Sequence, residues 1–300
     1  MTEPCLRRHP LGFLEVVDRP SAQELSAYYA DLYYQTERGS FRRDYAPEER
    51  HAIGLRITQR AARAEALLGI SGPGRLLDVG CGEGFLLADF ASRGWDVSGM
   101  DFSIAGVEAM NPAMVPHVRQ GDLFDLLAAA IASQQTHHLV WLGNVLEHVL
   151  DPIGLLEALR HLLTLGGILV VTVPNDGSPY QEDLFEAGLI DRRFWIAIPD
   201  HMSYFDAGSL RSIAQATGWD TLDILGDFPI DLFLSHPGSN YVMDRVLGPS
   251  AHAARLRLEA LVGRAGPERA NRFYSALADV GLGRNITAFL RPSTAKDDQT

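Results

Sequence analysis

The chain has 300 residues, of which 46% are hydrophobic and 21% charged. This balance is ordinary for a soluble globular protein, and no apolar run approaches the roughly 20 residues that span a bilayer. The formal net charge of −12 gives little attraction to nucleic-acid phosphates, so we expect a small-molecule substrate and neither a nucleic acid nor a membrane as partner. Two cysteines make no disulfide framework, and the N-terminal sequence lacks a secretory signal pattern, which predicts a cytoplasmic location.

The N-terminal residues 21–68 are predicted to be helical, because apolar side chains recur there at one-turn spacing. They include the aromatic and charged stretch 33–50, which we interpret as a lid. Residues 1–70 would then form an N-terminal helical cap. The glycine- and proline-rich residues 71–74 separate this cap from the domain that follows.

From residue 75 onward, short apolar runs alternate with helical patterns, which predicts a doubly wound α/β fold with a mostly parallel sheet. The expected strands are 75–80, 96–101, 115–120, 138–143 and 168–173, and the expected helices are 84–93, from Ser103, and 123–132. A further helix is expected to start at Asp151 and Pro152, an N-cap followed by a first-turn proline. Its buried leucines continue to Leu163, and Gly166 and Gly167 end it.

The C-terminal third departs from this alternation. A helix over 207–217 and a strand over 219–225 are followed by the mostly helical stretch 227–283, which is too long for a hairpin, and then by a last strand at 285–292. We expect the stretch 227–283 to cap the site or to build a homodimer contact.

These patterns divide the chain into a core and its additions. The predicted units are an N-terminal cap (1–70), a core (71–226 with 284–292, including a possible substrate loop at 175–206), a helical insertion (227–283) and a flexible tail (293–300).

The stretch "DVGCGEG" at 78–84 places three glycines between the first core strand and the first core helix. Glycines there let the backbone turn tightly and approach a ligand closely. Asp101 follows by about the 20 residues expected of a carboxylate that binds a ribose diol. The third glycine comes one residue too early for a dinucleotide-binding fingerprint. The carboxylate of Asp78 would repel a pyrophosphate, but it would suit a ligand that carries an ammonium and a sulfonium group. The pattern favours a cationic nucleoside.

Here the chain resembles the class I S-adenosylmethionine-dependent methyltransferases. The similar segments are "LLDVGCGEGFLL" (76–87), "GMDFS" (99–103), "GDL" (121–123), "NVLEHV" (144–149), "VPN" (173–175) and His201 to Phe205. The resemblance covers about residues 71–225 and the last strand, and is strongest to the ubiquinone-type O-methyltransferases and their natural-product and sugar relatives. It implies a Rossmann-like, seven-stranded sheet with an N-terminal helical lid. The insertion before the last strand departs from the family pattern, in which the last two strands form a hairpin.

The resemblance also implies S-adenosylmethionine as cofactor, with S-adenosylhomocysteine as product. The glycines would line its methionine portion, Asp101 its ribose, and Asp122 with the Leu123 amide its adenine. Phe102 would pack on the adenine or in the core, and Asn144 would lie near the methyl group or act as a capping residue. The full set of expected cofactor contacts is Asp78, Gly80, Cys81, Gly82, Gly84, Phe85, Asp101, Phe102, Ser103, Asp122, Leu123 and Asn144.

Methyl transfer from a sulfonium is an in-line displacement, in which the protein mainly aligns the reactants and excludes water. A hydroxyl nucleophile needs a base, for which His148 and His201 are candidates because imidazole titrates near neutral pH. The alternatives are a packed helix histidine at 148 and a structural hydrogen bond at 201. Isolated histidines and a lone Cys81 give no metal-ligand spacing, so no metal is expected.

Aromatic side chains are candidates for the acceptor site, because their faces suit a sulfonium cation, although ordinary packing would give the same pattern. They are Tyr28, Tyr33, Tyr34, Phe41, Trp195 and Tyr204. The sequence therefore predicts an O-methyltransferase that acts on a small biosynthetic intermediate. The alternatives are N-methylation of a small amine or amino sugar, a non-catalytic binding subunit, and, against the glycine spacing, a nicotinamide dehydrogenase.

Overall fold

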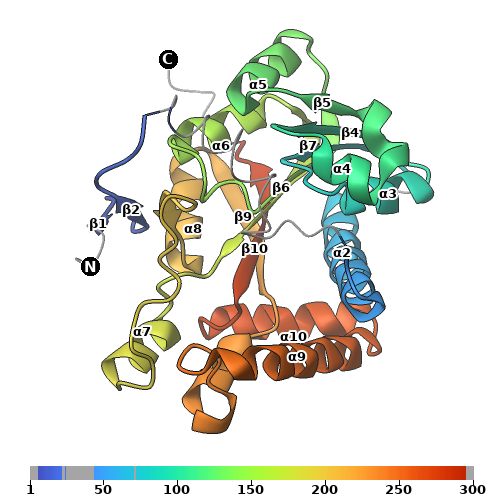
Figure 1. Cartoon of the computed structure of the whole chain (residues 1–300). Coiled ribbons are helices and arrows are strands. Elements are labelled where there is room, and N and C mark those ends of the chain that lie inside the picture. The colour runs from blue at the N-terminus through green and yellow to red at the C-terminus, as the bar shows by residue number, and fades with distance from the viewer. Residues whose placement is uncertain (1–5, 22–23, 25–43, 71, 295–300) are drawn as a thin grey trace.

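The computed structural model describes residues 6–21, 24, 44–70 and 72–294. Its centre is a seven-stranded sheet in the order β5-β4-β3-β6-β7-β10-β9 (Figure 1). The strands are β3 (Arg75–Val79), β4 (Asp96–Asp101), β5 (Val118–Gln120), β6 (His137–Gly143), β7 (Leu163–Pro174), β9 (Trp219–Gly226) and β10 (Asn285–Pro292). The first five pair in parallel, and β10 pairs antiparallel with both β7 and β9. The predicted doubly wound, mostly parallel sheet is confirmed.

Helices cover both faces of this sheet. Successive side chains of a strand point to opposite faces, so a strand with consecutive apolar residues must be covered on both. Leu77 and Val140 pack in one core cluster, and their neighbours Leu76 and Leu139 pack in a second. The first cluster includes side chains of α5 (Leu123–Ala132), α6 (Pro152–Arg160) and α8 (Ala207–Ala216), and the second those of α2 (Pro47–Leu68), α3 (Phe85–Ser92) and α10 (Pro267–Asp279). The apolar runs of the sequence are therefore strands buried on both faces.

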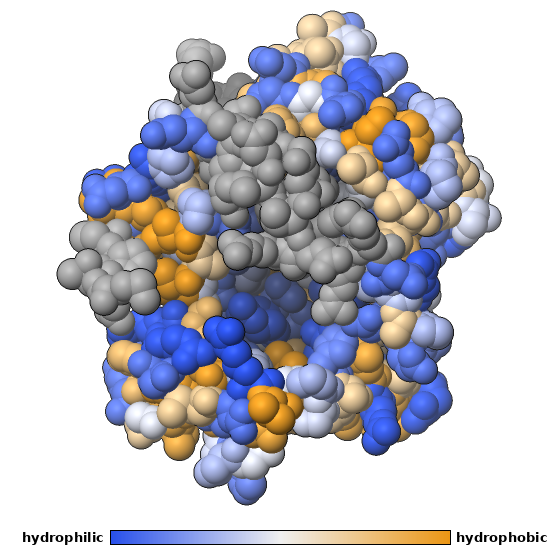
Figure 2. Space-filling model, in the orientation of Figure 1, coloured by the Kyte–Doolittle hydropathy of each residue, from blue (hydrophilic) through white to orange (hydrophobic). Residues whose placement is uncertain are grey.

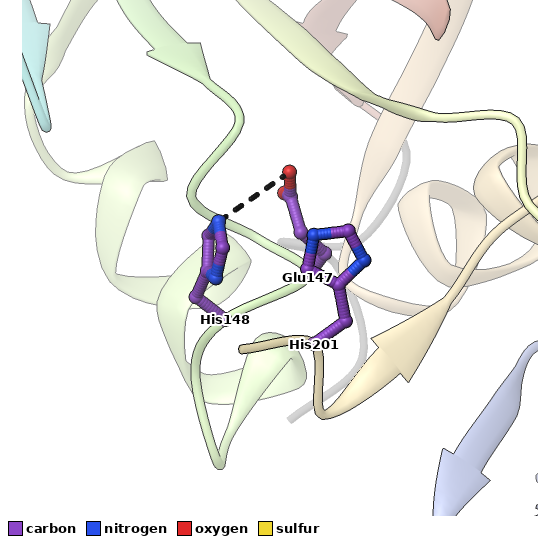
Figure 3. Close-up of side chains that lie close together, drawn as sticks. All are labelled: Glu147, His148 and His201. Carbon is purple, nitrogen blue, oxygen red and sulfur yellow. Dashed lines mark ion pairs between the residues drawn. The ribbon is translucent and has the colours of Figure 1, made fainter. Parts of the chain in front are cut away.

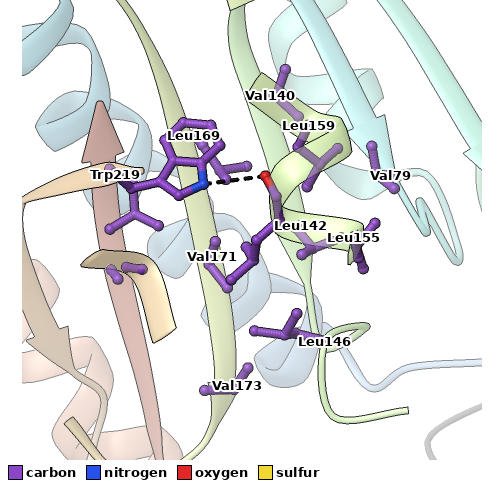
Figure 4. Packing of buried hydrophobic residues seen from close by; sticks show 14 of the residues in the cluster. Val79, Val140, Leu142, Leu146, Leu155, Leu159, Leu169, Val171, Val173 and Trp219 are labelled. Carbon is purple, nitrogen blue, oxygen red and sulfur yellow. Dashed lines mark hydrogen bonds between the residues drawn. The ribbon is translucent and has the colours of Figure 1, made fainter. Parts of the chain in front are cut away.

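Figure 4 shows the first of these clusters around β6 and β7. Trp219 at the start of β9 is 1% exposed, and its indole N–H donates to the Leu156 carbonyl of α6 at 3.2 Å. Burying a side chain of this size contributes about 2–3 kcal/mol to stability. The bond also satisfies the polar end of the indole, so the first helical layer is held firmly against the sheet.

Asp122 and Asp151 start two of the helices. The Asp122 carboxylate accepts from the Phe124 amide at 2.9 Å, and Asp151 accepts from Gly154 at 2.8 Å with Pro152 at the first helical position. The predicted start of α6 is confirmed.

The predicted end of α6 is wrong. The helix ends at Arg160, and β7 begins at Leu163, so Gly166 and Gly167 lie inside a strand. His137 pairs with Leu163 and its amide donates to the Leu162 carbonyl at 2.8 Å. Pairing with β6 therefore overrides the helical spacing of the leucines.

The insertion 227–283 is mostly helical, as predicted. It contains three short 3-10 helices, η3 (Ile230–Ser235), η4 (Pro237–Ser239) and η5 (Arg245–Leu247), followed by α9 (Gly248–Gly263) and α10. Both long helices contact α2: Arg56 forms an ion pair with Glu259 at 2.9 Å, and Gln59 donates a buried hydrogen bond to Asn271. The insertion and the N-terminal helix thus form one layer over the sheet. The predicted N-terminal helix is confirmed for 47–68, and the rest of 21–68 is largely outside the described residues.

A second, three-stranded sheet was not predicted from the sequence. It consists of β1 (Leu6–Arg8), β2 (Leu14–Val16) and β8 (Ser203–Tyr204), all antiparallel. Strands of two or three residues leave too short a pattern to detect. This sheet packs with α7 (Pro179–Glu186) and η3 in a third apolar cluster. Its last strand leads to Phe205, which forms a parallel bridge with Asn175 directly after β7. Within the described part of the chain, no helix is both long and apolar enough to cross a membrane.

Candidate active site

The glycine loop between β3 and α3 has the backbone conformation that the sequence predicts. Gly80, Gly82 and Gly84 all have positive φ, at 73°, 54° and 71°. A Cβ on Gly80 would lie 2.3 Å from Cγ2 of Val145, whereas a Cβ on Gly82 would meet nothing within 4 Å. Gly80 is therefore required by close packing against the segment after β6, while Gly82 faces open space where a ligand has access.

Asp101, at the end of β4, is 7% exposed and fixes this loop. Its Oδ2 accepts from the Gly82 amide at 2.8 Å, and its Oδ1 accepts from the Ser103 amide at 3.0 Å. A carboxylate oxygen has a second lone pair, so these bonds are compatible with a ribose hydroxyl as a further donor.

Asp78 is buried beneath the loop, with 4% of its surface exposed. Burial and the nearby charge of Asp101 raise its pKa to about 8. A cationic ligand would relieve this cost by stabilising the ionised form. Burial also raises the pKa of the Cys81 thiol, so Cys81 contributes a small side chain and its backbone rather than a reactive thiolate.

Glu83 in the glycine loop has a partner that sequence analysis missed. Its Oε1 accepts from the Tyr45 hydroxyl at 2.8 Å, and Tyr45 contacts Phe85 edge-on at a centroid distance of 5.8 Å. The segment before α2 therefore contacts the glycine loop directly. No sequence signal connects positions so far apart.

The expected adenine contacts lie at the start of α5 and after β4. Asp122 is exposed and uses Oδ1 as the helix cap, and Leu123 and Phe102 are half-buried. All three are accessible, but whether they bind adenine stays a prediction.

Asn144 directly follows β6 and is exposed, with φ of 55°. This left-handed conformation is uncommon outside glycine, although asparagine tolerates it better than most residues. Its amide donates to the Thr172 carbonyl at 2.8 Å, and no helix starts there. The capping alternative is therefore wrong, and the side chain stands open at the carboxyl end of the sheet.

Glu147, His148 and His201 converge beside this segment (Figure 3). His148 Nε2 lies 3.7 Å from Glu147 Oε1, and the rings of His148 and His201 lie 5.0 Å apart at 79°. His148 is in a turn rather than the helix considered as its alternative. The Met202 and Ser203 amides donate to the Glu147 carbonyl at 2.7 and 3.1 Å, which brings His201 against the turn.

The protonation of this cluster follows from its burial. Burial raises the pKa of Glu147 to about 8, and neither carboxyl oxygen has a hydrogen-bond partner among the described residues. Burial lowers the pKa of His148 to about 4. His148 Nδ1 lies 2.7 Å from the Asp200 carbonyl, which only accepts, so Nδ1 carries the proton and Nε2 the lone pair. At neutral pH both groups are uncharged.

A family model described as a methyltransferase domain matches residues 48–224, more than half of the chain. The chain belongs to this methyltransferase family. Two ubiquinone biosynthesis O-methyltransferases are similar to it. That of Psychrobacter arcticus is 31% identical over 170 residues, which are 54% of this chain and 64% of the relative. That of Paraburkholderia xenovorans is 31% identical over 157 residues, 50% of this chain and 66% of the relative. The match spans less than two-thirds of either relative.

The fold is also shared with a solved structure. The crystal structure of a SAM-dependent methyltransferase from Archaeoglobus fulgidus covers 82% of this chain and 94% of its own, with a TM-score of 0.51 and 18% identity. The predicted membership of the class I S-adenosylmethionine-dependent methyltransferases is confirmed, and with it the cofactor of that family. The similarity to ubiquinone biosynthesis O-methyltransferases agrees with the predicted branch.

In this methyltransferase, the donor atoms of Glu147, His148 and His201 all lie within 4.8 Å of one another, a grouping that could hold a metal ion. The sequence predicted no metal because these residues come from segments more than 50 positions apart. One carboxylate and two imidazoles are donors that suit Zn²⁺ or Fe²⁺.

The expected acceptor residues of the methyltransferase divide into two groups. Trp195 and Tyr204 are each 2% exposed in the third apolar cluster, and the Tyr204 hydroxyl donates to the His201 carbonyl at 3.2 Å. They therefore support the loop that carries His201, and their contact with an acceptor stays a prediction. Tyr28, Tyr33, Tyr34 and Phe41 lie outside the described residues.

The methyltransferase surface is hollowed in the middle of the face seen in Figure 2, with hydrophilic side chains in its depth. Sequence analysis gave no role to three ionisable residues near His201, which are Glu147, Asp176 and Arg284. Glu147 belongs to the "LEHV" motif, which was its only sequence signal. Asp176 and Arg284 had none.

Proposed function

We propose that this methyltransferase transfers a methyl group from S-adenosylmethionine to a hydroxyl of a small biosynthetic intermediate. The supporting observation is the convergence of His148, His201 and Glu147 next to the segment that packs on Gly80. Val145, which packs against Gly80 of the loop expected to hold the methionine portion, comes only two and three residues before Glu147 and His148. A base in this segment would serve a hydroxyl acceptor, which loses a proton as it attacks.

Within the cluster, we assign to His201 the role of accepting the proton from the acceptor hydroxyl. Burial leaves His148 a weak base, with a pKa of about 4, and leaves Glu147 protonated at neutral pH. The two histidine side chains are similarly accessible, at 17% for His201 and 16% for His148. His201 differs because its Nδ1 lies 3.4 Å from the Asp176 carboxylate, whose negative charge favours a proton on the ring. The expected catalytic role of His201 is thus retained, and His148 becomes a neutral neighbour.

Hydroxyl methylation also agrees with the relatives, which are named as O-methyltransferases. A neutral amine needs less help from a base, so N-methylation would leave this cluster without a purpose. A small-molecule acceptor and the exclusion of nucleic acid are part of the proposal and rest on the net charge of −12. A cytoplasmic location is also proposed, because two cysteines make no disulfide framework.

The test is an end-point assay with S-adenosylmethionine and a panel of phenols, catechols, sugar hydroxyls and small amines. Product is detected by the mass of one added methyl group, and NMR identifies the atom that carries it. We expect O-methyl products that require His201, with His201→Gln lowering turnover about 10²-fold or more. Turnover confined to amines would reject hydroxyl methylation. Tight S-adenosylhomocysteine binding without turnover on any compound would favour the non-catalytic binding subunit.

A second candidate mechanism uses the same three groups to hold a divalent cation that lowers the pKa of the acceptor hydroxyl. The unpartnered Glu147 carboxyl, 1% exposed, favours it because a buried carboxylate can be stabilised by a metal. It expects turnover to stop after dialysis against a chelator and to return with Zn²⁺ or Fe²⁺. Turnover that survives chelation with no metal detected by mass spectrometry excludes it.

A further inference from the structure

Asp176 is fixed where three segments of the chain meet, directly after β7. Its amide donates to the Phe205 carbonyl at 3.1 Å. The preceding Asn175 donates from its side chain to the Gly281 and Gly283 carbonyls at 3.1 and 3.0 Å. Asp176 therefore joins the end of β7 to the loop of His201 and to the end of the helical insertion.

The Asp176 carboxylate has different partners at its two oxygens. Its side chain is 1% exposed, and Oδ1 accepts from Nη1 of Arg284 at 2.5 Å. Oδ2 lies 3.4 Å from Nδ1 of His201. The two atoms do not form a hydrogen bond at this separation, and His201 Nδ1 is buried with no other hydrogen-bond partner among the described residues; catalytic contacts often tighten only when the ligands are bound. A carboxylate can only accept at this oxygen, so the contact favours a proton on Nδ1.

Arg284 also lies beside an aromatic side chain of the loop 175–206. Its guanidinium carbon lies 5.7 Å from the centre of the Phe194 ring. Burial alone would lower the pKa of Arg284, but the charges of Asp176 and Asp231 raise it overall. Asp231, in η3, accepts from the Tyr241 hydroxyl at 2.9 Å and from Gln181 Nε2 at 2.8 Å. Arg284 is thus kept charged and aimed at Asp176.

We propose that Asp176, fixed by Arg284, is a positioning residue that keeps the proton of His201 on Nδ1 and so leaves the lone pair of Nε2 for the acceptor hydroxyl. The inference rests on the proposed role of His201 in methyl transfer. A histidine with the wrong tautomer presents an N–H where the acceptor hydroxyl needs a lone pair.

Asp176→Asn separates this proposal from a merely structural role. Arg284 can only donate, so it selects the oxygen of the new amide, and the NH₂ group then faces Nδ1 of His201. Nδ1 becomes an acceptor, and the proton moves to Nε2. The matched control is Asp183→Asn, which removes an exposed carboxylate of α7 in the same region.

The experiment is a long-range ¹H–¹⁵N correlation spectrum of the histidine side chains, with the His201 signals assigned through His201→Gln. We expect the Nδ1–H tautomer in the wild-type protein and in Asp183→Asn, and the Nε2–H tautomer in Asp176→Asn. The Nε2–H tautomer in the wild-type protein would overturn the proposal even if the variant failed to fold. An unchanged tautomer in folded Asp176→Asn would also overturn it.

This readout needs no acceptor, so it is independent of whether hydroxyl methylation is correct. Once an accepted compound is known, Asp176→Asn should lower kcat about 10²-fold or more while leaving S-adenosylhomocysteine affinity unchanged. A shifted tautomer with unchanged kcat would overturn the catalytic importance of this positioning.

Discussion

The Asp101 carboxylate of β4 holds the Gly82 amide of the neighbouring loop at 2.8 Å. The residue expected to bind the ribose therefore also shapes the loop expected to hold the methionine portion. One substitution should affect both ends of the cofactor.

Asp101→Ala should weaken S-adenosylhomocysteine binding by about 10²-fold or more, because it removes a ribose acceptor and two charge-assisted bonds to loop amides. Calorimetric titration measures the change. Asp96→Asn at the exposed start of the same strand is the control and should bind normally. Equal affinity in Asp101→Ala and the control would show that the ligand does not bind at this loop.

Gly80 and Gly82 should respond differently to alanine. Gly80→Ala forces a Cβ against Val145 at positive φ, so we expect a loss of about 2–4 kcal/mol of unfolding free energy together with cofactor binding. Gly82→Ala has open space and should lose about 1 kcal/mol but still bind cofactor poorly. Chemical denaturation and calorimetry separate the two effects. Normal binding by Gly82→Ala would argue against a ligand at that position.

S-adenosylmethionine binding should tighten as pH rises from 6 to about 8. The pKa of Asp78 is about 8 in the empty site, and a cationic ligand favours its ionised form, so binding below pH 8 releases a proton. Calorimetry in two buffers of different ionisation enthalpy counts this proton. Asp78→Asn is the comparison, because titration of the ligand itself is the same in both proteins. A pH dependence that is identical in the variant would exclude Asp78 as its source.

Glu147→Gln should change how stability depends on pH. The pKa of Glu147 is raised from 4.5 to about 8 by burial, so the folded protein binds this proton more tightly than the unfolded chain. Its contribution to stability is complete below pH 4.5 and is lost as pH rises to about 8. The variant lacks this titration and should gain on the order of a few kcal/mol relative to the wild type between pH 5 and pH 9.

Urea denaturation of both proteins at pH 5 and pH 9 measures their difference in unfolding free energy. Asp78 is present in both proteins, so its contribution cancels in this difference. Parallel stability curves for the two proteins would mean that Glu147 is ionised throughout, as a bound cation would make it.

The sequence by itself determined the parallel core and the cofactor loop. Strands β4 and β10 have the predicted bounds. The chemistry of "DVGCGEG" lies within seven neighbouring residues. Positive φ at glycine and a carboxylate one strand later are local requirements, so local spacing is enough to find them.

Only the tertiary structure decided the groups around His201. Glu147 follows β6, Asp176 follows β7 and Arg284 precedes β10. These three strands lie side by side in the sheet. The β8 segment then brings His201 against the turn of His148. The same strand pairing ended α6 early and extended β7 to Leu163. Contacts between residues so distant in the chain depend on which strands pair, and neither periodicity nor spacing carries that information.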